Sequence, residues 1–299
     1  MLRNISLIKL RCYKLSQKKP YSVVYLMGGF GNQLFQLCFA NNLQRIGHHI
    51  ALDISNYSMP NDDSIERREL VLPTEYFGFT TNTKKTFNFW NNVYKYRKNN
   101  FRNIPLLPLK KFNDINYNEG RIGMMNFFVG YWQDINLILN NKDFLYSSLS
   151  RNALIKKGLD YQSKPGKTLL HIRRGDYLEM GEALSIEYYK NALRTADKEI
   201  NEFEYEIFTD DIDWVKNHSV FHSANDIHYS SASKEDTIKA FSKMLMNNNF
   251  IISNSTFSLL PAILKENATS KIISPFPWYR NSNKSINLRK QWIKLDNNG

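Results

Sequence analysis

Short apolar runs alternate with amphipathic stretches through the second half of the chain. We interpret the apolar runs as strands and the stretches with a 3.6-residue period as helices. The predicted strands are Thr168–Ile172, Tyr205–Thr209, Asp226–Tyr229, Phe250–Ser253 and Lys271–Ser274. The predicted helices are Ile186–Glu199, Asp213–His218, Glu235–Met246 and one that ends near Leu264. Strands separated by helices predict a parallel sheet with right-handed crossovers.

The first half of the chain opens with the same alternation. A strand is predicted over Ser22–Met27, a helix over Asn32–Ile46 and a second strand over Ile50–Ile54. Residues 60–120 are rich in Asn, Lys and aromatic residues, and we expect irregular and helical insertions there. The turn-forming residues Ser163–Gly166 mark the expected boundary between two α/β halves. The predicted organisation is therefore a basic extension at 1–20, an N-terminal domain at 21–164 and a C-terminal domain at 165–299.

Composition limits the classes of protein. A chain of 299 residues allows about two domains, and its net charge of +12 favours nucleic acid, anionic lipid or phosphorylated small molecules as partners. Cys12 and Cys38 are the only cysteines, so no disulfide framework is expected, and the pattern suits a reducing cytoplasm. The chain has no run of about 18 apolar residues, which argues against an integral membrane protein.

The first 19 residues contain basic but no acidic side chains, interleaved with apolar ones. The apolar stretch is too short and too interrupted to span a bilayer or to form a signal peptide, so we expect no secretion. This extension is either a disordered tail or an arm that binds an anionic membrane surface.

Polar clusters directly follow three of the predicted strands. His171–Asp176, Asp210–Asp211 and Asn254–Thr256 each begin where an apolar run ends. Carboxyl ends of parallel strands meet at one edge of a sheet, so these clusters predict one pocket. The guanidinium groups of Arg173 and Arg174 stay charged and bind phosphate oxygens in a bidentate manner, which favours a phosphorylated ligand. Taken alone, the arginine pair also fits a solvated charged loop.

Gly28–Asn32 forms a glycine turn between a strand and a helix. It is not the Rossmann fingerprint, because Leu34 stands where that pattern needs a glycine, and it is not a P-loop. Such a turn either directs backbone amides and Asn32 toward a phosphate or sugar oxygen, or simply connects two elements. Ser255–Thr256 fits either a helix cap or an anion site. The Asp-x-Asp pattern at Asp211–Asp213 fits a divalent cation, although strand-end carboxylates also bind ribose or nucleobase groups.

Five segments in a fixed order resemble a known family. They are Gly28–Gln36, Gly130–Gln133, His171–Tyr177, Phe208–Asp211 and Asn254–Ser258. Together they resemble the bacterial α-1,2-fucosyltransferases, and the likeness covers about residues 22–280. The resemblance implies two Rossmann-like domains facing across a cleft, of the glycosyltransferase-B type. It also implies GDP-fucose as donor substrate, with no metal and no other cofactor.

The resemblance assigns roles to residues of this chain. Arg173 is expected to hold the donor diphosphate, with support from Arg174, while Asn32 faces the fucose and the β-phosphate. The other residues implied on the donor side are Gly29, Gly31, His171 beside the guanosine, Asp210, Asp236 at the nucleobase, and Asn254, Ser255, Thr256 and Phe257 at the pyrophosphate. The sequence departs from the family pattern at Leu259-Leu260-Pro261, and we expect Pro261 to delay the start of the helix.

The acceptor side is less defined by the sequence. Tyr131, Trp132 and Gln133 form either an acceptor wall, because aromatic faces stack on galactose, or a buried aromatic strand. Asp53 on the acceptor side, Asp134, and Asp176, which we group with Arg173 and Asn32 as catalytic, are the candidate general bases. A phosphate oxygen is the alternative proton acceptor.

The implied activity is inverting transfer of L-fucose from GDP-fucose to the 2-hydroxyl of a terminal galactoside. The expected acceptor is a lipid-linked O-antigen or capsule repeat, and the expected location is the cytoplasm, with possible peripheral contact at the inner face of the plasma membrane. Alternatives are a fucosyltransferase of another linkage or GDP-sugar, an inactive sugar-nucleotide binder, and a basic RNA-binding protein. The last has no recognisable RNA motif and leaves the strand-end clusters unexplained, so no nucleic acid partner is expected.

Overall fold

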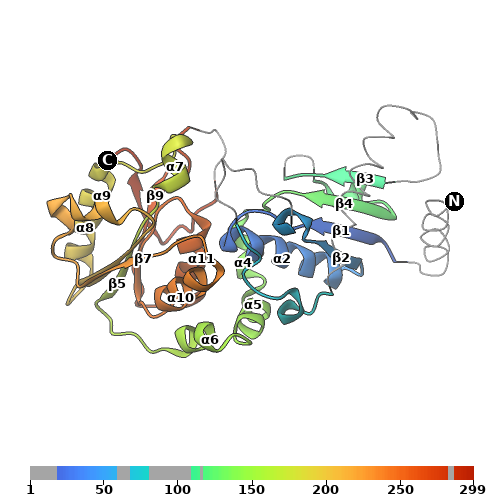
Figure 1. Cartoon of the computed structure of the whole chain (residues 1–299), viewed down its shortest axis with the longest axis horizontal. Helices are drawn as coiled ribbons and strands as arrows, with labels where there is room; N and C mark the ends of the chain where they lie inside the picture. Colours follow the sequence, from blue (N-terminus) through green and yellow to red (C-terminus); the bar gives the residue numbers. More distant parts are fainter. Residues whose placement is uncertain (1–18, 59–67, 81–108, 115–116, 282–285) are drawn as a thin grey trace. The chain divides into compact units, whose positions relative to one another are not determined.

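The computed structural model describes residues 19–58, 68–80, 109–114, 117–281 and 286–299 (Figure 1). The described parts of Met1–Gly28 and Gln33–Trp132 form one compact unit. A second unit comprises Gly29–Asn32 and the described parts of Gln133–Gly299. Each unit contains a sheet in which all paired strands run parallel. The predicted α/β class with two parallel sheets is confirmed.

The first unit has a 4-stranded sheet in the order β2-β1-β4-β3. Its elements are β1 (Tyr21–Tyr25), α2 (Phe30–Arg45) from Gln33 onward, β2 (His49–Asp53), η1 (Ser55–Ser58), η2 (Thr74–Phe77), β3 (Leu109–Phe112), η3 (Glu119–Arg121) and β4 (Met125–Val129). The central strands are apolar because both faces are covered, as is usual for parallel sheets. Aromatic rings fill part of the core. The ring centre of Phe39 lies 5.2 Å from that of Phe128 and 4.0 Å from that of Trp132, on which it stacks.

The second unit has a 6-stranded sheet in the order β10-β9-β8-β5-β6-β7. It starts with three helices, α4 (Ile135–Leu139), α5 (Lys142–Leu149) and α6 (Ala153–Asp160). The remaining elements are β5 (Lys167–Ile172), α7 (Gly175–Glu179), α8 (Ile186–Glu199), β6 (Glu204–Thr209), α9 (Ile212–Lys216), η4 (Ser219–Phe221), β7 (Asp226–Tyr229), α10 (Lys234–Met244), β8 (Asn249–Ile251), α11 (Thr256–Lys265), β9 (Ile272–Phe276) and β10 (Ile293–Asp296). Helices α8 and α9 cover one face of this sheet, and α10 and α11 cover the other (Figure 1).

The predicted alternation after residue 167 is confirmed. Helix Ile186–Glu199 and strand Asp226–Tyr229 match to the residue, and the other predicted boundaries differ by a few residues. Short elements without a clear apolar period were missed, among them α7, whose sequence Gly-Asp-Tyr-Leu-Glu has no buried residue. An element this short forms only where its neighbours hold it, because an isolated helical turn is unstable.

The observed division between the units lies after Trp132, earlier than the boundary predicted at Ser163–Gly166. Helix α6 explains the difference, because it packs against α10 and α11. The hydroxyl of Ser242 in α10 donates to the Leu154 carbonyl at 2.5 Å, and Lys265 Nζ donates to the carbonyls of Leu159 and Tyr161 at 2.8 and 2.9 Å. The Ser-Lys-Pro-Gly turn is therefore a loop inside the second unit.

Pro261 does not delay the start of α11, so that expectation was wrong. The helix begins at Thr256, with Ser255 as N-cap, and Pro261 lies inside it. Proline removes one backbone N–H from the helix, but burial of Leu259, Leu260 and Ala262 outweighs that loss.

Two expectations concern residues largely outside the described ranges. They are the basic extension at 1–20, and the insertions at 60–120, of which 68–80, 109–114 and 117–120 are described. Within the described part of the chain, every helix is too short or too polar to cross a bilayer.

The contact between α6 and α10 is a sensitive test of the second unit. A Cβ on Gly158 would lie 2.3 Å from the Ser242 carbonyl oxygen, so Gly158→Ala forces the two helices apart. We expect a loss of about 1–3 kcal/mol in the free energy of unfolding, although alanine is normally the better helix former. The exposed neighbour Lys157→Ala is the control and should change stability by less than about 0.5 kcal/mol in urea unfolding. Equal or greater stability of Gly158→Ala would contradict this packing.

Candidate active site

Pairing between β5 and β6 places two arginines opposite two aspartates. Ile172 pairs with Thr209 in the parallel register, so the next residues of the two strands, Arg173 and Asp210, follow at the same edge. Arg173 Nη1 lies 2.6 Å from Asp210 Oδ2. One position further, Arg174 Nε lies 3.0 Å from Asp211 Oδ2. The two predicted clusters are thus brought together by strand register.

Arg173 remains charged although it is largely buried. Its side chain is 18% exposed, and Nη2 forms a second ion pair with Asp176 Oδ1 at 2.6 Å. Burial opposes the charge, but Asp210 and Asp176 outweigh it, so the pKa of Arg173 is raised. The Tyr177 ring lies 5.5 Å from the guanidinium carbon. The site therefore holds a permanent cation at the end of a central strand.

Arg174 is fixed by different partners. Its guanidinium carbon lies 4.1 Å from the Trp214 ring centre, and its backbone N–H donates to Asp210 Oδ1 at 2.8 Å. Asp211, its ion-pair partner, also caps α9 by accepting from the Trp214 N–H at 3.0 Å. Arg174 is consequently tied to α9, which fits the expected supporting role better than direct capture of a ligand.

His171 lies inside the fold, with 4% of its surface exposed. Its Nδ1 is 2.8 Å from the hydroxyls of both Ser253 and Ser258. Burial lowers the pKa of His171 to about 3, with a smaller effect from the charge of Arg173. The imidazole is therefore neutral and links β5 to the start of α11, while its expected contact with guanosine stays a prediction.

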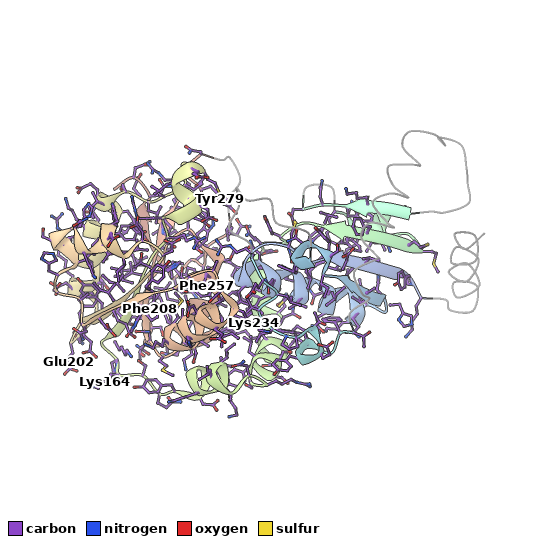
Figure 2. The ribbon with its side chains drawn as sticks, in the orientation of Figure 1. Lys164, Glu202, Phe208, Lys234, Phe257 and Tyr279 are labelled. Carbon is purple, nitrogen blue, oxygen red and sulfur yellow. The ribbon has the colours of Figure 1, made fainter. Side chains whose placement is uncertain are left out.

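The N-terminus of α11 contributes the third predicted cluster. Ser255 Oγ accepts from the Phe257 N–H at 3.3 Å, and Phe257 lies in the first turn of the helix (Figure 2). Asn254 is buried, and its amide donates to the Glu182 carbonyl at 2.9 Å. Tyr177 Oη donates to the Asn254 carbonyl at 3.2 Å, which connects α7 to this loop. Helix N-termini attract anions, so this arrangement can assist Arg173 in binding one.

The glycine turn adds Asn32 to the second unit. Gly28 has φ of 79°, which favours glycine, and a Cβ on Gly31 would lie 2.5 Å from Thr256 Oγ1. Asn32 Oδ1 accepts from Thr256 Oγ1 at 3.1 Å and from Gln133 Nε2 at 2.8 Å. A Cβ on Gly29 would meet no atom within 4 Å. Of the predicted turn residues, Gly31 and Asn32 are thus placed at Thr256.

Asp236 lies in the first turn of α10, which follows β7 at the same edge of the sheet. The Ser231 hydroxyl donates to Asp236 Oδ2 at 2.5 Å and lowers the pKa of this half-buried carboxyl group. An ionised carboxylate can accept hydrogen bonds from the N–H groups of a nucleobase. That role of Asp236 stays a prediction.

Two predicted acceptor-side residues are enclosed in the first unit. Asp53 is 1% exposed and accepts from the Ser55 N–H at 3.0 Å, and burial raises its pKa. Trp132 is 7% exposed and stacks on Phe39, which favours the interpretation of a buried aromatic residue. It lies in the loop after β4 and not in a strand. Tyr131 is 39% exposed. The burial of Asp53 favours a structural role over proton transfer.

Some polar residues of this region were missed in the sequence. Asp114 accepts the backbone N–H groups of Tyr131 and Trp132 at 3.0 and 2.6 Å, but it lies in a segment without periodicity. Asp134, by contrast, was already a candidate base in the sequence, and it caps α4 by accepting from the Asn136 N–H at 2.9 Å. Tyr279 donates to Gln133 Oε1 at 2.6 Å, and nothing in its local sequence indicates this.

The Asp-x-Asp pattern is used in another way. Asp210 and Asp211 pair with arginines, and Asp213 lies in the first turn of α9. Within the described part of the chain, no group of three or more His, Cys, Asp or Glu side chains is placed to hold a metal ion.

A parallel α/β sheet with a charged arginine and a helix N-terminus at its carboxyl edge is typical of enzymes that bind phosphorylated substrates. The chain belongs to glycosyl transferase family 11, whose family model matches residues 9–296. It is therefore a glycosyltransferase, and the family expected from the five motifs is confirmed.

Relatives of similar length are known in Escherichia coli. An alpha-1,2-colitosyltransferase is 26% identical over 297 residues, covering 92% of this chain and 98% of that protein. The O-antigen biosynthesis glycosyltransferase WbnK is 30% identical over 304 residues, covering 90% of this chain and 99% of that protein.

Solved structures also resemble the chain at low identity. The fucosyltransferase NodZ from Bradyrhizobium has a TM-score of 0.41 and 13% identity, covering 83% of this chain and 93% of that chain. Arabidopsis thaliana FUT1 in complex with GDP has a TM-score of 0.47 and 12% identity, covering 93% of this chain and 76% of that chain.

Arg173 is the first residue to test. Arg173→Ala removes the cation placed to receive a departing anion, and we expect turnover to fall by about 10²–10³-fold, the usual effect of losing one preorganised donor. The exposed arginine of α8 provides the matched control: Arg194→Ala should retain activity within about twofold. Near-normal activity of Arg173→Ala in a steady-state transfer assay would remove Arg173 from the site. Circular dichroism checks that the variant is folded, since Asp210 loses an ion-pair partner.

The buried imidazole predicts a pH-dependent stability. His171 titrates near 3 in the folded chain and at its ordinary value of 6.5 when unfolded. Between these pH values only the unfolded chain binds the proton, so the free energy of unfolding falls as pH is lowered, by up to about 1.4 kcal/mol per pH unit. His171→Asn keeps a hydrogen-bonding group without the titration. Urea unfolding from about pH 7 to about pH 4 should show a shallower decline for His171→Asn; parallel declines would refute the neutral buried histidine.

Proposed function

We propose that this glycosyltransferase transfers L-fucose from GDP-fucose, with inversion and without a metal ion, to the 2-hydroxyl of a terminal galactoside. The observation that carries the proposal is Arg173, a permanently charged side chain held between Asp176 and Asp210 at the end of β5. Family membership and the N-terminus of α11 at the same edge of the sheet support it.

The chemistry requires a cation where the leaving group forms. As the bond between the anomeric carbon and GDP breaks, negative charge accumulates on the diphosphate, and an oriented guanidinium stabilises it. Asp176 is 39% exposed and Asp210 14%, so a diphosphate displaces the Asp176 carboxylate more readily than the Asp210 carboxylate. Asp210 then keeps Arg173 oriented while Asp176 is released.

The acceptor hydroxyl must lose a proton during transfer. Asp176 suits this role best among the three candidate aspartates, because Asp53 is enclosed and Asp134 caps α4. Once the diphosphate has replaced it at Arg173, its carboxylate can accept a proton from the acceptor hydroxyl. A phosphate oxygen of the leaving group is the alternative acceptor.

Transfer of colitose is a second candidate function. A relative that is 26% identical over 92% of this chain is an alpha-1,2-colitosyltransferase. Colitose lacks the 3-hydroxyl of fucose, so the two donors differ by one polar group. A site that hydrogen-bonds this hydroxyl discriminates strongly against the deoxy sugar, because its buried polar group is then left unpaired.

The proposed acceptor is an O-antigen or capsule repeat, supported by a relative whose name assigns it to O-antigen biosynthesis. We propose that transfer takes place in the cytoplasm, on a lipid-linked glycan. The basic extension at 1–20 would supply contact with anionic lipid, in keeping with the net charge of +12.

The deciding experiment offers the purified chain GDP-fucose or GDP-colitose together with β-galactosides, in buffer containing EDTA. We expect GDP release and a new α-1,2 linkage, with GDP-fucose preferred. The fucose assignment is wrong if only GDP-colitose reacts. Binding of GDP without transfer to any galactoside would indicate an inactive sugar-nucleotide binder, and salt-sensitive RNA binding without GDP affinity would overturn the proposal.

A further inference from the structure

A chain of hydrogen bonds in the second unit ends at Asn32. Tyr279 Oη donates to Gln133 Oε1 at 2.6 Å, and Gln133 Nε2 donates to Asn32 Oδ1 at 2.8 Å. Thr256 Oγ1 donates to the same Asn32 oxygen at 3.1 Å. Tyr279 follows β9 and is far from Asn32 in the sequence (Figure 2). Two residues from separate segments, Gln133 and Thr256, therefore donate to the Asn32 oxygen, and Tyr279 binds the first of them.

The direction of these hydrogen bonds sets the orientation of the Asn32 amide. A side-chain amide has an accepting oxygen and a donating NH₂ group at opposite corners. Because two donors share the Asn32 oxygen, its Nδ2 points the other way. No described residue accepts a hydrogen bond from Asn32 Nδ2. Asn32 thus presents a donor with a fixed direction.

Gln133 needs a partner of its own to act in this way. An unrestrained glutamine amide rotates, and either its oxygen or its nitrogen could face Asn32. The Tyr279 hydroxyl binds the Gln133 oxygen and so turns the nitrogen toward Asn32. The close approach of Gly31 to Thr256, where a Cβ would lie 2.5 Å from Oγ1, keeps the other donor in place.

We propose that Gln133 and Tyr279 are positioning residues that hold the Asn32 NH₂ group toward the oxygens of the leaving diphosphate. The inference rests on the proposed function and deepens it. It moves Gln133 from the acceptor wall to the support of the donor site. A donor fixed before reaction stabilises developing negative charge without the cost of reorienting, which requires such a supporting set of hydrogen bonds.

The test compares three substitutions at two positions. Gln133→Glu replaces the donating NH₂ by a carboxylate oxygen, which repels Asn32 Oδ1 and turns the Asn32 amide around. We expect kcat to fall by about tenfold or more at pH near 8, with a smaller change in KM for the donor. The kcat of Gln133→Leu should fall by a similar factor. The kcat of Tyr279→Phe should fall about threefold. The matched control is Tyr161→Phe, at an exposed tyrosine, which should keep full activity.

The pH profile separates positioning from a purely structural role. When the carboxyl group introduced by Gln133→Glu is protonated, its O–H can donate to Asn32 Oδ1 as the glutamine does. The kcat of Gln133→Glu relative to the unmodified chain should therefore rise as pH is lowered toward about 5, whereas that of Gln133→Leu should not. Full activity of Gln133→Glu at high pH would mean that the hydrogen bonds run in the reverse direction, and the proposal would fail. The proposal would also fail if the pH profile of Gln133→Glu followed that of Gln133→Leu.

A readout without turnover separates this proposal from the function on which it rests. In ¹⁵N spectra of the full chain, the side-chain NH₂ signals of Asn32 are assigned by their loss in Asn32→Asp. They should shift in Tyr279→Phe and should shift with pH only in Gln133→Glu. Unchanged NH₂ signals in these variants refute the positioning network. Absence of transfer from GDP-fucose by the unmodified chain, with the expected shifts present, would refute the donor assignment alone.

Discussion

The parallel pairing of β5 with β6 is the constraint on which the site depends. It sets Arg173 beside Asp210, one residue beyond the last strand pair, and Arg174 beside Asp211, two residues beyond it. A guanidinium cannot lose its proton in a protein, so a largely buried arginine needs carboxylate partners. Asp210, which directly follows β6, is the carboxylate partner of Arg173. A shift of β6 by one residue would separate Arg173 from Asp210 and turn the side chains of the shifted strand to the opposite face.

The same edge gathers the remaining polar groups through neutral hydrogen bonds. His171 joins the end of β5 to Ser253 and Ser258, so the loop after β8 is held at the level of the arginines. Tyr177 extends this link from α7 to the Asn254 carbonyl. His171, Ser253 and Ser258 are buried and hydrogen-bonded to one another, so they act as rigid supports. The groups left to meet a ligand are the charged Arg173, the α11 N-terminus and the Asn32 amide.

Local patterns predicted much of the second unit. Its central strands are short apolar runs buried on both faces, and its longer helices bury one apolar face, so both patterns are visible in the sequence, as in Ile186–Glu199. The boundary between the units was placed too late, because the association of α6 with α10 depends on Gly158 and Ser242, which are remote in sequence. Pro261 was misjudged for a related reason: the packing of α11 outweighs one missing hydrogen bond.

The sequence by itself determined the α/β class, the strand-end clusters and the family, because periodicity and ordered motifs are local properties of the chain. Only the tertiary structure decided which side chains meet. It enclosed Asp53 and Trp132, which the sequence left open as acceptor-side residues, and it paired Asp176 with Arg173. It also joined Tyr279 and Gln133 to Asn32. Burial and hydrogen-bond partners arise between residues far apart in the chain, and no local pattern records them.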